Sequence, residues 1–369
     1  MIFCANPAAQ FQSYQAEIEA SVLAVLRSNR YILGPEVAAL EREFAEFIGA
    51  KFAVGVANGT DALELAMRAL DIGPGDEVVT VSHTAVATVA AIEATGAVPV
   101  LVDVDPVFFT LNPCQLREVL TPKTRAVIAV HLYGQAADLD AIVAFCSEHG
   151  LALIEDGSQA HGAKWQGKRL GSIGRIGCFS CYPTKNLGAI GDAGLVTTSD
   201  ETLAEKVRML REYGWQRRYV SEISGRNSRL DEVQAAILRI KLRRLDADNA
   251  KRSAIANKYS QGLKTSWVKL PEVRDGADAV HHLYVIQSPY RTSLIKHLDN
   301  HGIQAGIHYP VPIHLQPAYG AGIRTAQDMR VTEQLATQVL SLPMYPELLS
   351  HEVVQVIVAV NSHQPACAA

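Results

Sequence analysis

The chain has 369 residues, of which 48% are hydrophobic and 20% charged, which is typical of a compact globular protein with about two domains. A formal net charge of −4 argues against a nucleic-acid-binding face. No apolar run approaches the roughly 20 residues that cross a bilayer, so we expect neither a nucleic-acid nor a membrane partner.

Strand-like and helical segments alternate through the first two thirds of the chain. Strands are expected at 52–57, 78–81, 98–104, 126–130, 151–155 and 195–198, with helices at 60–70, 85–94, 113–120 and 139–149. This alternation predicts an α/β fold in which a mostly parallel central sheet is covered by helices on both faces.

The pattern becomes mainly helical after residue 198. Residues 230–259 predict one long helix or two in succession, followed by a strand at 282–286 and helices at 293–301 and 331–340. We place a domain boundary near residue 245. The chain is thus expected to form a large domain of residues 1–245, with an N-terminal arm, and a small C-terminal α/β domain of residues 246–369.

Six cysteines are too few for a disulfide scaffold in a chain of this length and indicate a reducing, cytoplasmic location. Cys178 and Cys181 form a CxxC pair within an apolar strand. No second pair completes a zinc site. We therefore expect packing cysteines and no metal.

The turn Asn58-Gly59-Thr60 lies between an expected strand and an expected helix. A helix that begins here exposes unpaired backbone N–H groups, which bind phosphate well. Gly59 permits close approach of the backbone, and Thr60 adds a hydroxyl donor. Taken alone, however, the turn is better explained as an ordinary helix cap.

The segment EDGSQAHGA, residues 155–163, follows an apolar strand. Open α/β sheets bind their ligands at the carboxyl ends of the strands. A carboxylate buried there needs a partner, and the protonated nitrogen of a pyridine ring would pair with Asp156. Gln159, three residues further on, is placed to reach a ring hydroxyl, whereas His161 is expected to be a satisfied core histidine.

The segment SCYPTKNLGA, residues 180–189, presents Lys185 in a turn after another apolar strand. A lysine amine has an ordinary pKa of about 10.4, so a nucleophilic lysine needs surroundings that lower this pKa. Apolar and Gly-rich sequence flanks Lys185. We therefore expect Lys185 to hold a cofactor as a Schiff base and then to act as a general base, with Ser180 as a phosphate ligand.

A fourth segment, GRNSRLDEVQAA at residues 225–236, indicates by itself only a polar turn that caps a helix. Together with NGTDAL, EDGSQAHGA and SCYPTKNLGA, in this order, it resembles the DegT/DnrJ/EryC1/StrS family of sugar aminotransferases. The resemblance extends from about Tyr31 to Pro346, which is nearly the whole chain.

The resemblance implies a type I aminotransferase fold, a pyridoxal 5'-phosphate cofactor, and a homodimer whose active sites lie at the subunit interface. It makes Lys185 the Schiff-base lysine and places Asp156 at the pyridine nitrogen and Gln159 at the ring oxygen. The residues that it places on the phosphate are Gly59, Thr60, Ser180 and, from the neighbouring subunit, Asn227.

Two further segments, HTAVAT at 83–88 and HLYGQ at 131–135, look most like members that aminate carbon 3 of nucleotide-linked 3-keto-6-deoxyhexoses, here a dTDP sugar. By the same resemblance L-glutamate is the amino donor, and Tyr182, His308 and Tyr309 contact the sugar. Many members carry an aromatic residue that stacks on the cofactor where this chain has Ala85. The Ala85 methyl or His83 is expected to cover that face of the ring.

Other functions stay open at this point. The alternative amine acceptors are a keto sugar with its ketone at carbon 4 and a cyclitol ketone. Related dehydratases carry a histidine in place of the lysine, so Lys185 argues against dehydration. A PLP-binding regulator without turnover is the alternative from another class, but no basic stripe or DNA-binding helix pair supports it.

Overall fold

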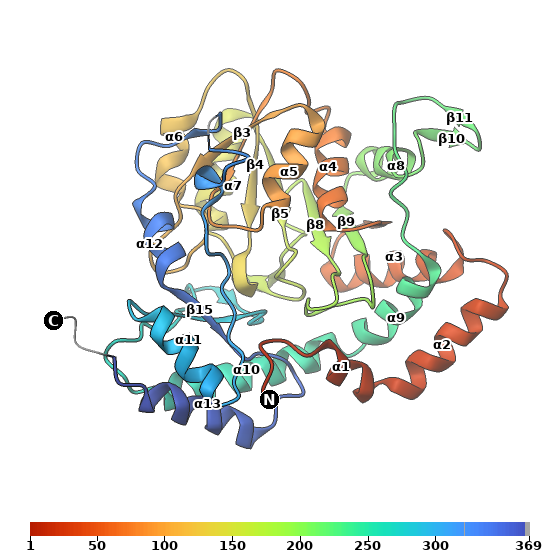
Figure 1. Cartoon of the computed structure of the whole chain (residues 1–369). Coiled ribbons are helices and arrows are strands. Elements are labelled where there is room, and N and C mark those ends of the chain that lie inside the picture. The colour runs from red at the N-terminus through yellow and green to blue at the C-terminus, as the bar shows by residue number, and fades with distance from the viewer. Residues whose placement is uncertain (321, 366–369) are drawn as a thin grey trace.

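The computed structural model describes residues 1–320 and 322–365, and its centre is a sheet of eight strands in the order β1-β9-β8-β5-β4-β2-β3-β14 (Figure 1). Every strand of this sheet runs in the same direction except β9, which is antiparallel to both of its neighbours. The strands are β1 (Phe52–Val56), β2 (Glu77–Val81), β3 (Val98–Val102), β4 (Thr124–Val130), β5 (Ala152–Asp156), β8 (Ile176–Ser180), β9 (Gly194–Thr198) and β14 (Arg324–Thr325).

Helices cover both faces of this sheet. Successive side chains of a strand point to opposite faces, and the five consecutive residues 126–130 of β4 are all buried. The predicted α/β fold is therefore confirmed. The surrounding helices are α3 (Pro35–Ile48), α4 (Gly59–Ala69), α5 (Ala87–Thr95), α6 (Leu116–Val119), α7 (Leu139–His149), α8 (Glu201–Leu210) and α12 (Arg330–Gln338).

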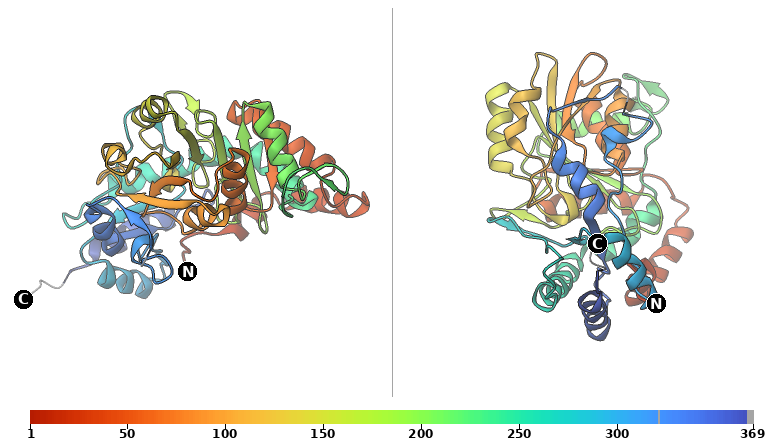
Figure 2. Two further views of the ribbon diagram at one scale, coloured as in Figure 1. Left: turned by 90° about the horizontal axis from the view of Figure 1, so that it is seen from above. Right: turned by 60° about the vertical axis from the view of Figure 1, so that its left-hand side comes forward.

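A second apolar cluster lies beside the sheet and is built mostly from residues 255–360, with Ile2 from the N-terminus. It is formed by α10 (Leu245–Gly262), α11 (Arg291–Asn300), α13 (Ser350–Ser362) and the antiparallel pair β13 (Tyr284–Gln287) and β15 (Val339–Leu342). The N-terminal helices α1 (Pro7–Ser13) and α2 (Gln15–Arg27) project from the body in the views of Figures 1 and 2, and α2 packs on α9 (Glu232–Leu242).

The remaining strands are short. They are β6 (Lys164–Trp165), β7 (Lys168–Arg169) and β12 (Ala277–Asp278), which form one small sheet, and β10 (Trp215–Arg217) and β11 (Val220–Ser221), which form a projecting hairpin (Figure 1). No helix in residues 1–320 or 322–365 has both the length and the apolarity that crossing a bilayer requires.

The C-terminal half corrects one sequence prediction and resolves another. Residues 230–259 contain two helices, with the break at Arg243 and Arg244. The helix predicted at 331–340 is wrong at its end, because Val339 and Leu340 belong to β15 and pair with β13. The division at residue 245 stays a prediction; β14 and α12, although beyond it, pack with the large sheet.

Candidate active site

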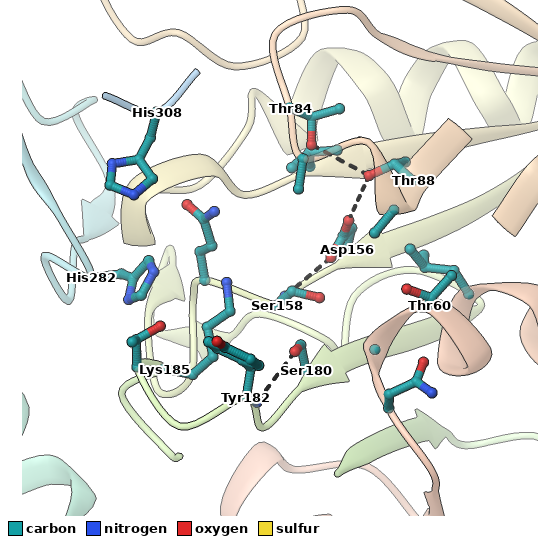
Figure 3. A pocket seen from close by; sticks show the side chains of 18 of the residues that line it. Thr60, Thr84, Thr88, Asp156, Ser158, Ser180, Tyr182, Lys185, His282 and His308 are labelled. Atoms are coloured by element: carbon teal, nitrogen blue, oxygen red, sulfur yellow. Dashed lines mark hydrogen bonds between the residues drawn. The ribbon is translucent and has the colours of Figure 1, made fainter. Parts of the chain in front are cut away.

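A cavity of about 620 Å³ opens where β5 and β8 end and α4 begins (Figure 3). Because β5 and β8 are parallel neighbours, their carboxyl ends meet at one edge of the sheet. The predicted site residues that line this cavity are Gly59, Thr60, Asp156, Gln159, Ser180, Tyr182, Lys185, His308 and Tyr309. The structure thus brings these residues together from four separate segments of the chain, and of the predicted site residues only Asn227 lies outside the cavity.

The N-terminus of α4 forms one wall of the cavity. Asn58 caps this helix, with its Oδ1 accepting from the N–H of Asp61 at 2.8 Å. The N–H groups of Gly59 and Thr60 have no acceptor in the described part of the chain. A Cβ on Gly59 would stand 2.5 Å from Cβ of Ser180, so only glycine allows the helix to begin against β8. The expected cap is present, and two N–H groups at the start of the helix are available to an anion.

Asp156 is the last residue of β5 and only 5% of its surface is exposed. Its Oδ1 accepts from the N–H of Ser158 at 3.1 Å, and its Oδ2 accepts from Oγ1 of Thr88 at 3.2 Å. Thr88 in turn lies 3.3 Å from Oγ1 of Thr84. These contacts fix the orientation of a buried carboxylate at the edge of the cavity.

Lys185 lies in the turn after β8, where its N–H donates to the carbonyl of Tyr182 at 2.8 Å. Burial lowers the pKa of its amine to about 8, although Asp156 and Cys181 act in the opposite direction. A larger fraction of the amine is therefore neutral near pH 7 than in an exposed lysine. This is the property that a nucleophilic lysine requires.

The loop that carries His308 and Tyr309 is held at the cavity by hydrogen bonds with Tyr133 and Gln159. Oε1 of Gln159 accepts from the N–H of Tyr133 at 2.8 Å, while its Nε2 donates to the hydroxyl of Tyr309 at 3.1 Å. The hydroxyl of Tyr133 donates to the carbonyl of His308. His308 and Tyr309 are therefore held at the cavity by Tyr133 and by one amide that also faces the predicted ring site.

Of the two residues expected to cover one face of a bound ring, only Ala85 lines the cavity. His83 is buried behind it, with its Nε2 2.8 Å from the hydroxyl of Tyr133. His161 is fully buried, as a core histidine would be, but neither of its ring nitrogens has a hydrogen-bond partner among residues 1–320 and 322–365. The expectation of a satisfied histidine is therefore wrong.

Asn227 lies on an exposed loop and does not line the cavity of its own subunit. The preceding residue, Arg226, ties this loop to α4 by ion pairs with Glu64 and, at 3.5 Å, with Asp61. Asn227 is therefore not part of the cavity within a single chain.

Sequence reasoning assigned no role to several residues of the cavity wall, even where they lie within the motifs quoted above. They are Thr84, Thr88, Ser158, Thr184, Asp192 and His282. Among these residues His282 lies furthest along the chain. The only signal for it in the sequence was its place at the start of the strand expected at 282–286. Cys178 and Cys181 are buried and unpaired, as packing cysteines should be.

Comparisons with known proteins agree with this arrangement. A Streptomyces venezuelae enzyme, dTDP-3-amino-3,4,6-trideoxy-alpha-D-glucose transaminase, is 46% identical over 354 residues, which cover 96% of this chain and 93% of the relative. The dTDP-3-amino-3,6-dideoxy-alpha-D-galactopyranose transaminase of Aneurinibacillus thermoaerophilus is 46% identical over 350 residues, covering 95% of this chain and 96% of the relative.

The crystal structure of S. venezuelae DesV in complex with a ketimine intermediate matches the fold with a TM-score of 0.95 and 45% identity, covering 98% of this chain and 97% of that one. The expected aminotransferase fold is thereby confirmed. A family model described as the DegT/DnrJ/EryC1/StrS aminotransferase family matches residues 12–361. The chain therefore belongs to the DegT/DnrJ/EryC1/StrS aminotransferase family.

Proposed function

We propose that this chain transfers an amino group from L-glutamate to carbon 3 of a nucleotide-linked keto sugar, a dTDP-3-keto-6-deoxyhexose. One observation carries the proposal: a lysine amine with a lowered pKa and a fixed carboxylate, Lys185 and Asp156, line one cavity. The names of the two transaminase relatives point to the sugar class and to carbon 3.

The cavity fits pyridoxal 5'-phosphate, on which this family depends. The cofactor needs an amine for attachment, a carboxylate for its ring nitrogen and a site for its phosphate. Lys185 and Asp156 supply the first two, and the N-terminus of α4 with Ser180 supplies the third. When bound, the cofactor supplies a protonated ring that withdraws electrons from the carbon that loses its proton.

The protein residues divide the remaining work. Lys185 would hold the cofactor through its amine, and the same amine, when neutral and free, would take the proton from the α-carbon of the donor. Asp156, held by Thr88 and the N–H of Ser158, keeps the proton on the ring nitrogen. One N–H of the Gln159 side-chain amide donates to Tyr309. The second N–H would donate to the ring oxygen of the cofactor.

The sugar would lie at the opposite side of the cavity, against Tyr182, His308 and Tyr309. Burial raises the pKa of Tyr309 to about 12, so its hydroxyl stays protonated at neutral pH. Since that hydroxyl accepts from Gln159, its own proton is free to donate to a sugar oxygen. Burial, together with the charge of Lys185, lowers the pKa of His308 to about 4, which keeps this imidazole neutral.

The phosphate site gives a steric prediction. Gly59→Ala places a methyl group against Ser180, and overlap of this kind costs roughly 1–3 kcal/mol. We expect cofactor affinity to fall about 10- to 100-fold, as measured by titrating the cofactor-free protein. Gly322→Ala is the matched control, because, apart from its chain neighbours, no atom of the residues that the structure describes lies within 4 Å of its added Cβ. Equal affinities for the two variants would contradict the phosphate assignment.

A homodimer with shared sites completes the proposal. Asn227 is exposed and outside its own cavity, and the loop that carries it is anchored to α4 by Arg226. We place its amide on the cofactor phosphate of the partner subunit. The location is proposed as cytoplasmic, because the five cysteines in the described residues are free thiols, which suits a reducing compartment.

Mixing two inactive variants tests the shared site. Lys185→Ala lacks the attachment amine, and Asn227→Ala lacks the partner's phosphate contact. A mixed dimer has one site in which both residues are intact, so we expect activity to reappear after the two variants are unfolded and refolded together. Each variant refolded alone controls for residual activity. A mixture that stays as inactive as its components would refute the exchange of Asn227 between subunits.

The substrate is tested by following the conversion of L-glutamate to 2-oxoglutarate with a panel of keto compounds. The panel contains dTDP-linked 3-keto and 4-keto hexoses and a cyclitol ketone. Turnover with the 3-keto sugar supports the proposal. Preference for the 4-keto sugar or the cyclitol ketone would contradict amination at carbon 3 of a sugar. Silence with every acceptor and with glutamate alone would favour a regulator without turnover.

A further inference from the structure

His282 lies just before β13, is 6% exposed, and lines the same cavity as Lys185 (Figure 3). The side chains of His282 and Lys185 reach this cavity from two segments that are 97 residues apart in sequence. After burial, the largest influence on the imidazole is the charge of Lys185. The two side chains thus line one cavity, and Figure 3 draws them in the same part of it.

The hydrogen bonds of Asn186 determine which nitrogen of His282 carries the proton. Nδ2 of Asn186 donates to Oδ1 of Asn249 at 2.8 Å and to the carbonyl of Val280 at 3.0 Å. Both of its N–H groups are committed, so Oδ1 of Asn186 is the atom that faces Nδ1 of His282 at 3.2 Å. Nδ1 therefore carries the proton, and Nε2 keeps an unprotonated lone pair.

The surroundings of His282 keep the ring neutral. Burial has the largest effect and lowers the pKa of the ring well below the ordinary value of 6.5. The charged or titratable groups that face the ring lower this pKa further; they are Lys185, Arg252, His308 and His161. Nε2 has no hydrogen-bond partner within residues 1–320 and 322–365. It is also not fully buried, so a donor in the cavity can reach it. The cavity therefore contains an acceptor that is ready to bind a donor and that does not take up its proton.

We propose that Nε2 of His282 accepts a hydrogen bond from the amine of Lys185 and thereby directs the lone pair of the neutral amine toward the carbon that loses its proton. His282 is then a positioning residue, at which no bond is made or broken. The proposal rests on the proposed function, because it assumes that Lys185 acts as the base.

The sign of the effect on Lys185 follows from the chemistry. A hydrogen bond from an ammonium group is stronger than one from a neutral amine, so an acceptor raises the pKa of the amine. The other groups that face Lys185 are Asp156, Cys181, His161 and His308. Removal of the acceptor at His282 alone should lower the pKa of Lys185 further below about 8.

The experiment measures this pKa in the cofactor-free full chain. The rate at which trinitrobenzenesulfonate modifies Lys185 is followed from about pH 6 to pH 10, with the modified peptide identified by mass. We expect His282→Phe to lower the pKa of Lys185 by about one unit, as the loss of one charged hydrogen bond would. His282→Gln, which offers an amide oxygen as acceptor, should restore most of the shift.

His161→Phe is the matched control. His161 also has its pKa lowered by burial and by the charge of Lys185, but it does not line the cavity. Its replacement should leave the pKa of Lys185 unchanged. An unchanged pKa in His282→Phe, or an equal shift in His161→Phe, would overturn the proposal.

A second measurement needs no variant, which matters if His282→Phe fails to fold. The ¹⁵N spectrum of the wild-type chain should show His282 as the neutral tautomer with its proton on Nδ1; a proton on Nε2 would exclude the acceptor role. Failure of the proposed function is distinguishable, because it would appear as a wild-type protein that does not convert glutamate, whatever the tautomer and pKa.

In the holoenzyme, the half-reaction with glutamate, followed by stopped-flow absorbance, should slow about 10- to 100-fold in His282→Phe, because the amine loses its orientation. The affinity for glutamate should stay near that of the wild type, and His282→Gln should recover most of the rate. An equal loss of rate in both variants would contradict positioning by an acceptor.

Discussion

Replacement of Lys185 by alanine is expected to abolish amine transfer, with a loss of at least about 10³-fold in the rate of glutamate conversion. The variant loses both the amine that attaches the cofactor and the base that moves the α-proton. Its visible absorbance band, which reports the covalent attachment, should disappear although the cofactor still binds through its phosphate. Absorbance spectra and a 2-oxoglutarate assay measure the two effects.

Lys241 provides a matched control for this prediction. Burial lowers the pKa of Lys241 to about 8, as it does that of Lys185, but Nζ of Lys241 donates to the carbonyl of Gly188 at 2.6 Å and does not line the cavity. Lys241→Met should lose stability and keep the absorbance band. A low pKa alone therefore does not define the attachment site. A band that survives in Lys185→Ala and vanishes in Lys241→Met would reverse the assignment.

Replacement of Asp156 by asparagine is expected to lower kcat by about 10²- to 10⁴-fold while the cofactor remains attached. Asparagine keeps the shape of the side chain but cannot hold a proton on the ring nitrogen by charge. The ring then withdraws electrons less well from the reacting carbon. Single-turnover kinetics with glutamate measure the loss directly, because that half-reaction contains the proton transfer.

Asp192→Asn is the control for the loss of one negative charge at the cavity. Asp192 also lines the cavity but is exposed, and the hydrogen bonds that hold the Asp156 carboxylate come from Thr88 and Ser158 instead. Its replacement should change kcat by less than about 10-fold, since an exposed charge is screened by water. Equal losses in both variants would show that Asp156 acts only through the general field of the site.

Three central residues of the site share one property: each lies in a short segment at the end of a strand. Gly59, Asp156 and Lys185 follow apolar strands, and parallel strands bring such ends together without any knowledge of distant contacts. The structure places all three in one cavity. Their position was therefore predictable from local pattern, whereas their chemical roles, which local chemistry and the resemblance both suggest, stay predictions.

Three contacts that the sequence did not predict join distant segments of the chain. Thr88 reaches Asp156 across 68 residues, and Tyr133 reaches His308 across 175. His282 depends on Asn186, 96 residues earlier. No periodicity encodes such pairs, because each depends on how two strands or loops meet in the folded chain. The helix predicted at 331–340 ended wrongly for the same reason, since pairing with β13 draws Val339 and Leu340 into a strand.

The covalent attachment of the cofactor is tested most directly by reducing the holoenzyme with borohydride and locating the added mass by peptide mapping. Reduction makes the link between amine and cofactor permanent. The account predicts one modified peptide, which contains Lys185. A label on Lys241 or on any other lysine, or no label in a protein that still converts glutamate, would contradict it.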